Sequence, residues 1–432
     1  MSGSDAADGA DVVLSSHDDV HHAFRSRSLR QALYDEGGVV MADCLLTLHG
    51  DAHRTRRRLE NRLFRREMFT RWEREELGAT IDAILVPAID AGEGDLITLG
   101  YRITMNLTAL VAGIDCPTGT TDETDDLYGF VRTFSEGATL VHSTRDHAVV
   151  RAEVQEALEQ FDRAFLEPSI RRRRRALEAA RADPSADGLV PRDVLTTLLQ
   201  YGDDLTLTHE IIRREVAFYL QAGSHSTANA FTHTADELFG WIVSHPGRGR
   251  GLTDRAGADA LTHDDRRFLQ RCVHETLRLH PASPVAWRRP TEPTVLASGL
   301  ELAAGALVVL DIEAANRDPS RWGKDADRFD PDRSVPNGVP PWGHSFGGGA
   351  HACIGAEFDG GMEVRSDAGP LDEAHLFGTV EVMVEALLRA GGRPDPERPP
   401  WRDPLSTRRH FAGYPVRFGA PTTNEEHADA SG

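Results

Sequence analysis

Hydrophobic residues recur at helical spacing along most of the chain, whereas short strand-like runs are confined to one late region. The spacing predicts helices over residues 51–89, 100–114, 149–182, 189–200, 211–244, 264–280 and 375–389. It predicts short strands over residues 294–296, 301–303 and 306–311. The fold class predicted from the pattern is therefore mainly α with a minor β region.

No internal repeat or long linker divides the chain. Proline and glycine end several predicted helices, as at His245-Pro246-Gly247. Residues 329–361 are rich in both and carry no periodic pattern, and ordered irregular segments of that length are usually functional. We expect a single domain over residues 11–420, with frayed polar tails at residues 1–10 and 421–432.

The charge and cysteine content exclude several classes of protein. The 432 residues include 48 basic and 68 acidic side chains, a net charge of −20, whereas a nucleic-acid binder needs a basic surface. The four cysteines form no C-x-x-C pair, so neither a zinc ribbon nor a disulfide framework is indicated. No apolar stretch reaches the length of a membrane span, and the N-terminus lacks a signal-peptide pattern. We expect a cytoplasmic protein without nucleic-acid or membrane partners.

The most informative segment reads Phe346-Gly347-Gly348-Gly349-Ala350-His351-Ala352-Cys353-Ile354-Gly355. A glycine-rich loop with one cysteine suits a thiolate that approaches a large flat cofactor, because glycine lacks a Cβ and adopts positive φ. Amide groups of such a turn can also point at the sulfur and tune a metal behind it. A buried structural cysteine is an alternative. A phosphate-binding loop is disfavoured, since no Gly-Lys-Ser or Gly-Lys-Thr follows.

Two pairs of residues share a helix face. Glu275 and Arg278 are three residues apart, so they can pair with each other and with Arg333 from a later loop. His53 and Arg57 are four residues apart, so both can donate to a ligand that carries two carboxylates. Each spacing also occurs on ordinary exposed helices, where an ion pair contributes only about 0.5 kcal/mol.

The centre of the predicted helix 211–244 is unusual. Gly223 lies mid-helix, where glycine costs about 1 kcal/mol relative to alanine. Hydroxyl side chains at 226 and 227 can hydrogen-bond back to helix carbonyls and bend the helix. A bend of this kind beside a cofactor would make room for a small ligand.

The cysteine segment matches every fixed position of F-G-x-G-x-H-x-C-x-G, and with it the chain resembles the cytochrome P450 family of haem-thiolate monooxygenases. Residues 275–278 resemble the family's E-x-x-R, residues 53–57 its H-x-x-x-R, and residues 222–227 its oxygen-binding segment. The resemblance implies a cytochrome P450 fold, haem b as the cofactor and Cys353 as the ligand of the haem iron.

The resemblance also implies roles for individual residues. Those expected to hold haem or its propionates are His53, Arg57, Arg288, Phe346, His351, Cys353 and Gly355. Those expected to brace the cysteine loop are Glu275, Arg278 and Arg333. Those expected to deliver protons are His225, Ser226 and Thr227, although His225 stands where the family has an acid and Ser226 where it has a threonine. The expected substrate pocket includes Phe218, Ala222, Val285 and Trp287.

The function implied by the resemblance is oxidation of a small organic substrate, such as a natural-product intermediate, with dioxygen and electrons from a separate ferredoxin-type partner. Because histidine at 225 replaces a fixed carboxylate by a group that titrates near neutrality, two alternatives stay open. One is an enzyme that uses peroxide, or that couples or rearranges its substrate. The other is a haem-thiolate sensor without catalysis.

Two further features concern the surface. Residues 359–374 are polar and interrupt the helix expected after the cysteine, which predicts an inserted loop on the face behind Cys353. Residues 54–66 hold seven arginines against Glu60, a basic stripe that suits an acidic ferredoxin. A solvated helix face explains the stripe equally well.

Overall fold

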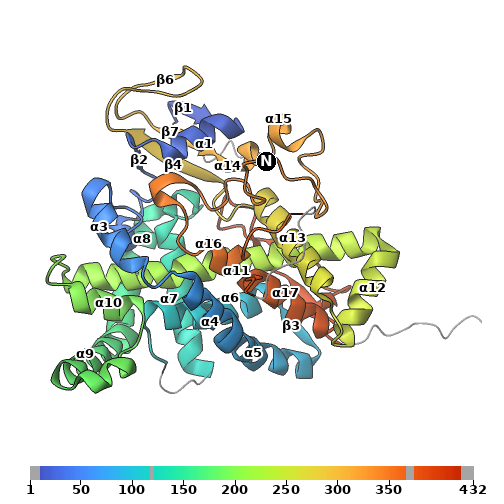
Figure 1. Cartoon of the computed structure of the whole chain (residues 1–432), viewed down its shortest axis with the longest axis horizontal. Coiled ribbons are helices and arrows are strands. Elements are labelled where there is room, and N and C mark those ends of the chain that lie inside the picture. Colours follow the sequence, from blue (N-terminus) through green and yellow to red (C-terminus); the bar gives the residue numbers. More distant parts are fainter. Residues whose placement is uncertain (1–9, 117–120, 366–373, 420–432) are drawn as a thin grey trace, which may run out of the picture.

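A 36-residue helix, α11 (His209–Ser244), runs through the middle of the molecule (Figure 1). Thr208 caps it by accepting a hydrogen bond from the N–H of Ile211, and Pro246 follows its end. The predicted helix over 211–244 is therefore confirmed. The computed structural model describes residues 10–116, 121–365 and 374–419. The predicted tails lie outside the described residues, apart from Ala10.

The other helices surround α11, and the mainly α fold class is confirmed. In chain order they are α1 (His17–Arg25), α2 (Gly38–Met41), α3 (Gly50–Glu60), α4 (Arg66–Arg71), α5 (Leu77–Ala91), α6 (Leu96–Ala112), α7 (Thr121–Ala138), α8 (His147–Phe161), α9 (Glu167–Ala182), α10 (Val194–Tyr201), α12 (Pro246–Gly257), α13 (His263–Leu279), α14 (Ile312–Ala315), α15 (Pro319–Trp322), α16 (Ala356–Gly360) and α17 (Thr379–Arg389). Short π and 3-10 turns are η2 (Trp72–Glu76), η3 (Leu140–His142), η4 (Asp162–Leu166), η5 (Pro184–Leu189) and η6 (Gly349–His351). Within the described ranges, no helix combines the length and apolar composition that a membrane crossing requires.

The main sheet lies at one end of the molecule, beside α1 and α14 (Figure 1). Its strand order is β1 (Val12–Leu14), β7 (Val308–Asp311), β4 (Val285–Pro290) and β2 (Leu29–Gln31), and only the β1–β7 pair in it is parallel. The smaller sheets join β3 (Glu93–Asp95), β11 (Pro415–Arg417) and β8 (Arg393–Pro394); β9 (Trp401–Arg402) and β10 (Phe411–Gly413); and β5 (Thr294–Val295) and β6 (Glu301–Leu302). The three predicted strands are thus present as β5, β6 and β7.

The closest packing against α11 comes from α6. A Cβ at Gly100 of α6 would lie 3.4 Å from the Cα of Ala228, and a Cβ at Gly223 of α11 would overlap the methyl group of Thr108. The hydroxyls of Thr108 and Ser224 form a 2.7 Å hydrogen bond between the two helices. Gly223 therefore allows α6 and α11 to approach closely, and this packing explains why a glycine lies in the middle of α11.

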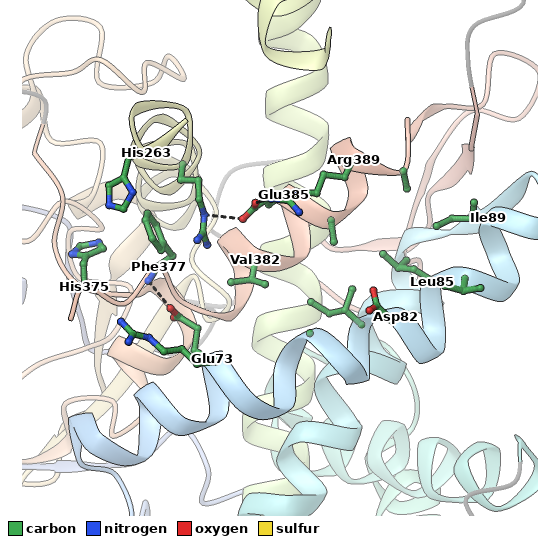
Figure 2. Close-up of a pocket in the computed structure, with 17 residues that line it drawn as sticks. Glu73, Asp82, Leu85, Ile89, His263, His375, Phe377, Val382, Glu385 and Arg389 are labelled. Atoms are coloured by element: carbon green, nitrogen blue, oxygen red, sulfur yellow. Dashed lines mark hydrogen bonds and ion pairs between the residues drawn. The ribbon is translucent and has the colours of Figure 1, made fainter. Parts of the chain in front are cut away.

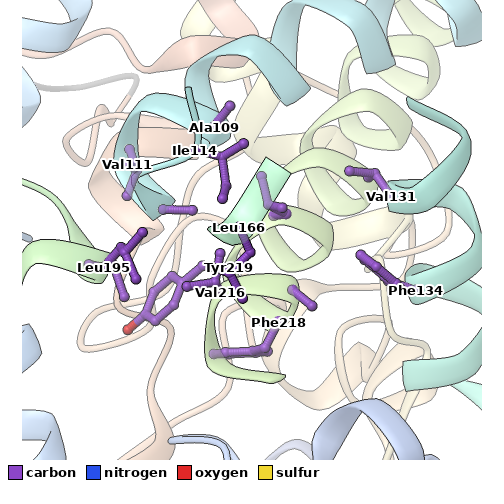
Figure 3. Close-up of a cluster of buried hydrophobic side chains, with 14 of the residues drawn as sticks. Ala109, Val111, Ile114, Val131, Phe134, Leu166, Leu195, Val216, Phe218 and Tyr219 are labelled. Atoms are coloured by element: carbon purple, nitrogen blue, oxygen red, sulfur yellow. The ribbon is translucent and has the colours of Figure 1, made fainter. Parts of the chain in front are cut away.

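One large apolar cluster joins the N-terminal half of α11 to α6, α7 and α10. Figure 3 shows Phe218 and Tyr219 of α11 among apolar side chains from these helices, including Ala109, Phe134 and Leu195. Burying such side chains contributes about 1.5 to 3 kcal/mol each relative to exposure. The cluster fixes the turn of α11 that precedes Ala222.

Two predicted helices are divided in the structure. The stretch 51–89 forms α3, α4, η2 and α5, with a turn after Glu60 that lets both Leu59 and Leu63 be buried. The stretch 149–182 is interrupted by the π turn η4 just before Pro168, whose missing N–H removes one helical hydrogen bond. Helix α7 was absent from the prediction.

The inserted loop lies between α16 and α17, and its two ends are held side by side. We call this point the neck of the loop; it consists of Gly361, Met362, Leu376 and Gly378. Gly361 and Gly378 both have positive φ, 74° and 88°, and the N–H of Met362 donates to the carbonyl of Leu376 at 2.9 Å. The hydroxyl of Thr379 donates to the carbonyl of Phe358, which links α17 directly to α16. The C-terminal helix predicted to restart at His375 therefore starts at Thr379. Residues 366–373 of the predicted loop lie outside the described residues.

We expect Gly378→Ala to lower the free energy of unfolding by about 2 kcal/mol, because a Cβ at this positive φ would overlap the backbone of Gly361. Gly240→Ala is the matched control, since Gly240 is an exposed helical residue of α11 with no atom near the added Cβ. The control is expected to gain about 1 kcal/mol. Urea unfolding measures both, and equal midpoints for the two variants would contradict the proposed neck.

Candidate active site

The loop that carries Cys353 is packed against α1. Gly347 and Gly349 have φ of 65° and 64°, and a Cβ at Gly349 would overlap the carbonyl oxygen of Phe24 and lie 3.1 Å from the Cα of Arg25. The N–H of Cys353 donates to the carbonyl of Phe346 at 2.9 Å, which closes the loop. Glycine is required at 349 both for its backbone conformation and for this contact.

The Cys353 thiol faces a cavity of about 320 Å³. The side chain is exposed toward the cavity, while protein around its other sides makes burial the dominant effect and raises the pKa of the thiol to about 11. A hydrogen bond from the N–H of Gly355 and the charge of Arg57 lower this pKa in part. The thiol is therefore protonated near neutral pH until a cation or metal at the sulfur favours the thiolate.

Four basic side chains gather at one end of the cavity: His53, Arg57, Arg288 and His351. The rings of His53 and His351 lie 4.2 Å apart, and an Nη of Arg57 donates to the carbonyl of Ala352 at 2.8 Å. Burial lowers the pKa of His351 to about 3 and that of Arg288 to about 10.

This basic end has no carboxylate acceptor among the described residues. His53 Nε2 and His351 Nδ1 are buried without a hydrogen-bond partner among the described residues, and Arg288 donates to Gln31 Oε1 and the Trp287 carbonyl but to no carboxylate. A ligand with carboxylate groups would satisfy these donors.

The structure brings the three predicted bracing residues together. Arg278 is fully buried and makes two 2.7 Å hydrogen bonds to the Glu275 carboxylate. Arg333 donates to the same carboxylate at 3.0 Å. The other Nη of Arg278 donates to the carbonyls of Asn316 and Ala326, both at 2.7 Å.

Asn316 connects these bracing residues to the cysteine loop. Its side-chain carbonyl accepts from the N–H of His344 at 2.7 Å, and its amide donates to the hydroxyl of Ser345 at 3.0 Å. Ser345 immediately precedes the segment that ends in Cys353. The buried charges of α13 are thus connected to the loop by direct hydrogen bonds.

On α11, Ser226 and Thr227 line the same cavity as Cys353. The hydroxyl of Ser226 donates to the carbonyl of Ala222 at 2.6 Å. Thr227 interacts with Asp359 of α16, a buried carboxyl whose pKa is raised to about 6 by burial and lowered in part by the Thr227 hydroxyl. Asp359 was not predicted, and nothing in the sequence pattern marks it.

The prediction that His225 delivers protons is wrong in its geometry. His225 is not among the cavity-lining residues; its Nδ1 is hydrogen-bonded to the hydroxyl of Tyr101, and its ring lies 5.1 Å from that of His410. Successive helical residues differ by about 100° in direction, so a helix that turns Ser226 into the cavity turns His225 away from it.

Of the four residues predicted to form the substrate pocket, three line the cavity and one does not. Phe218, Ala222 and Val285 line the cavity. Trp287 is not among the lining residues; it packs against the small apolar cluster of Leu33, Val285, Leu307 and Val309. Its strand neighbours Ala286 and Arg288 line the cavity. The lining residues that the sequence analysis missed include Tyr34 and Phe64.

A larger depression of about 780 Å³ lies between α5 and α17 (Figure 2). Two of its charged groups have partners: Arg266 pairs with Glu381 and Glu385, and Glu73 accepts from the N–H groups of Phe377 and Gly378. Figure 2 shows Leu85, Ile89 and Val382 beside these pairs. This depression is lined by no cysteine and by no cluster of basic side chains like the one at the basic end of the Cys353 cavity. The candidate site is therefore the cavity of Cys353.

Comparison with known proteins identifies the family. The model of the family described as Cytochrome P450 matches residues 10–364. The chain is 29% identical over 181 residues to "Bifunctional cytochrome P450/NADPH--P450 reductase 2" of Bacillus subtilis (strain 168), which covers 39% of the chain and 17% of that protein. It is 30% identical over 189 residues to "Salviol synthase" of Salvia pomifera, covering 42% of the chain and 37% of that protein.

Solved structures share the fold along almost the whole chain. The crystal structure of CalO2 aligns with a TM-score of 0.69 at 20% identity, covering 94% of this chain and 90% of CalO2. P450BioI in complex with an acyl-ligated acyl carrier protein aligns with a TM-score of 0.68 at 17% identity, covering 94% and 92%. The curated relatives are matched over less than half of their length, from 17% to 42%.

We expect Glu275→Gln to lower the free energy of unfolding by about 3 to 5 kcal/mol, because it leaves Arg278 and Arg333 buried without their shared carboxylate. Glu292→Gln is the control, since Glu292 is exposed in a turn and surface substitutions change stability by about 0.5 kcal/mol or less. Urea unfolding of both variants measures the difference. A loss below about 1 kcal/mol for Glu275→Gln would contradict a bracing role.

Proposed function

Because this chain belongs to the cytochrome P450 family, we propose that it is a haem-thiolate monooxygenase that oxidises a small organic substrate. Its oxidant is dioxygen, and its electrons come from a separate ferredoxin-type protein. The observation that carries the proposal is Cys353, which faces one cavity together with Ser226 and Thr227 of α11.

The described residues fit the haem of this family. Haem carries two propionate carboxylates, and the basic end of the cavity offers His53, Arg57, Arg288 and His351 without a carboxylate of its own. The unpartnered ring nitrogens of His53 and His351 are the donors that such a group would satisfy. Phe346, Cys353 and Gly355 line the same cavity, and Cys353 would supply the thiolate that holds the haem.

Residues of this chain set the basicity of the thiolate and exclude water from the cavity. Haem held by a cysteine thiolate supplies the reductive activation of dioxygen. The Gly355 N–H donates to the Cys353 sulfur and limits the basicity of the thiolate. Apolar lining residues such as Phe218, Ala222 and Val285 exclude water and contact the substrate.

Proton delivery falls to the two hydroxyls on α11. Because the proton of Ser226 is engaged by the Ala222 carbonyl, its oxygen is free to accept a hydrogen bond from a ligand or water in the cavity. Thr227 connects the cavity to the Asp359 carboxyl, whose pKa of about 6 suits proton exchange near neutrality. Ser226 and Thr227 are therefore the proposed proton-handling residues, with Asp359 behind Thr227.

One observation favours a second function. Since His225 turns away from the cavity, no titratable side chain of the predicted catalytic segment reaches it, and an enzyme that uses peroxide needs less proton delivery than one that uses dioxygen. Product formation with ferredoxin and reductase supports the monooxygenase. Product with peroxide alone supports the peroxide-using enzyme, and spectral binding with neither activity supports a sensor.

We expect the purified protein to contain haem b, and its reduced form with carbon monoxide to show the strongly red-shifted Soret band of thiolate ligation. Cys353→Ser should abolish that band, because the serine hydroxyl does not replace the thiolate. Cys116→Ser is the control, since Cys116 is a half-buried thiol outside the cavity, and it should keep the band. A wild-type protein that binds no haem would exclude the proposed function.

The basic stripe supports an electron-transfer surface. Arg56 is buried against Glu215 and Arg57 faces the cavity, while Arg62 and Arg65 are exposed. Arg66 pairs with Glu357, the fourth residue after Cys353, at 2.9 Å. This end of the stripe therefore adjoins the helix that follows the cysteine loop.

Reversing Arg62 and Arg65 to Glu should slow reduction by an acidic ferredoxin by about tenfold at low salt and flatten its dependence on ionic strength. Reversing Arg174 and Arg175, two exposed arginines of α9, keeps the net charge change the same at a remote place. Stopped-flow reduction kinetics compare the two double variants. Equal rates for both would assign the stripe to a solvated helix face.

A further inference from the structure

A histidine at the end of α13 lines the cavity that holds Cys353. His280 is the C-cap residue of α13, and its N–H donates to the carbonyl of Thr276 at 2.7 Å. Because the residue before a proline avoids the helical backbone conformation, Pro281 ends the helix at this point. The side chain of His280 is thereby left at the wall of the cavity.

His280 is hydrogen-bonded to a carboxyl group that reaches solvent. Its Nε2 lies 2.7 Å from Oε1 of Glu237 on α11. The two side chains are 23% and 28% exposed. Imidazole and carboxyl groups in hydrogen-bond contact exchange protons readily. The pair therefore connects solvent to the wall of the cavity through two titratable side chains.

Two other titratable groups lie near His280. The ring of His233 on α11 stacks on the ring of His280, with centroids 4.5 Å apart and planes 11° apart. Burial, and to a smaller extent the charge of His280, keeps the pKa of His233 well below its usual value, so His233 is neutral. Asp236 accepts from the hydroxyl of Tyr414 at 2.9 Å. Glu237 is therefore the acid in contact with His280.

The other carboxyl groups at the cavity wall, within the described part of the chain, are buried. Asp359 lines the cavity and is 7% exposed. Tyr219 also lines it and donates to Glu60 at 2.5 Å, but Glu60 has no exposed surface. These acids can hold a proton beside the cavity, whereas the partner of His280 can take one from solvent.

We propose that Glu237 and His280 carry protons from solvent into the cavity. This inference rests on the proposed function and adds the source of its protons. His280 gives a proton to water in the cavity and takes one back from Glu237, which regains its own from solvent. His233, which stacks on His280, lies six residues after Thr227, or about 9 Å along the helix. About three hydrogen-bonded waters span that distance.

The first experiment counts electrons in the haem-loaded full chain, with dioxygen, a ferredoxin and its reductase, and without substrate. Each dioxygen then leaves either as hydrogen peroxide, which takes two electrons and two protons, or as two waters, which takes four of each. His280→Gln should slow water formation by about tenfold or more and raise the share of peroxide, because glutamine keeps the hydrogen bond but transfers no proton. Glu237→Gln should do the same.

The double variant should be no slower than either single variant, because residues that act in series are not additive. His209→Gln is the matched control. His209 also lies on α11 with a carboxylate 2.8 Å from its Nε2, that of Asp162, but outside the cavity lining. The control should keep the wild-type share of peroxide. An unchanged share in His280→Gln, additive effects, or an equal change in the control overturns the proposal.

A crystal structure of the haem-loaded protein gives a readout that does not depend on turnover. The Nδ1 atom of His280 should contact water in the cavity, and haem or protein atoms that cover Nδ1 would overturn the proposal. The carbon monoxide spectrum tests the proposed function separately, because His280→Gln should leave the thiolate band intact. A wild-type protein without that band overturns the proposed function, whereas an intact band with an unchanged peroxide share overturns only the proton path.

Discussion

Three charged side chains buried between α13 and the loops before Cys353 hold the site in place. Arg278 has no exposed surface, so each of its N–H groups has to find an acceptor inside the protein. The acceptors are Glu275 and the carbonyls of Asn316 and Ala326. Because these carbonyls belong to loops without regular structure, satisfying one guanidinium fixes the path of the chain toward the cysteine.

The same need for acceptors shows where a buried charged side chain lacks a charged partner among the described residues. Arg278 and Arg333 are matched by Glu275, and Arg56 is matched by Glu215. Arg288 is buried in the wall of the cavity and donates only to neutral groups among the described residues. The chain has 68 acidic residues, yet the described part of it places none of them against this guanidinium. This end of the cavity therefore requires an anion that the described residues do not supply.

Helix α11 shows how packing and chemistry share one element. Gly223 allows α6 to approach closely, and Ser224 and Thr108 join the two helices by a hydrogen bond. Ser226 and Thr227 face the cavity, while His225 faces the opposite cluster around Tyr101 and His410. Three consecutive residues thus serve two different sites, because a helix turns its side chains by about 100° per residue.

The sequence by itself determined the mainly α fold, the long helix that became α11 and the pairing of Glu275 with Arg278. These follow from local rules of spacing and capping, which act over a few residues. The role of the cysteine loop and the bracing role of Arg333 were implied by the resemblance of whole motifs to a family. Only the tertiary structure decided that His225 and Trp287 lie outside the cavity and that Asp359 lines it. The position of each side chain depends on how its helix or strand packs against partners distant in the chain. Such packing involves whole elements, and no local pattern of residues records it.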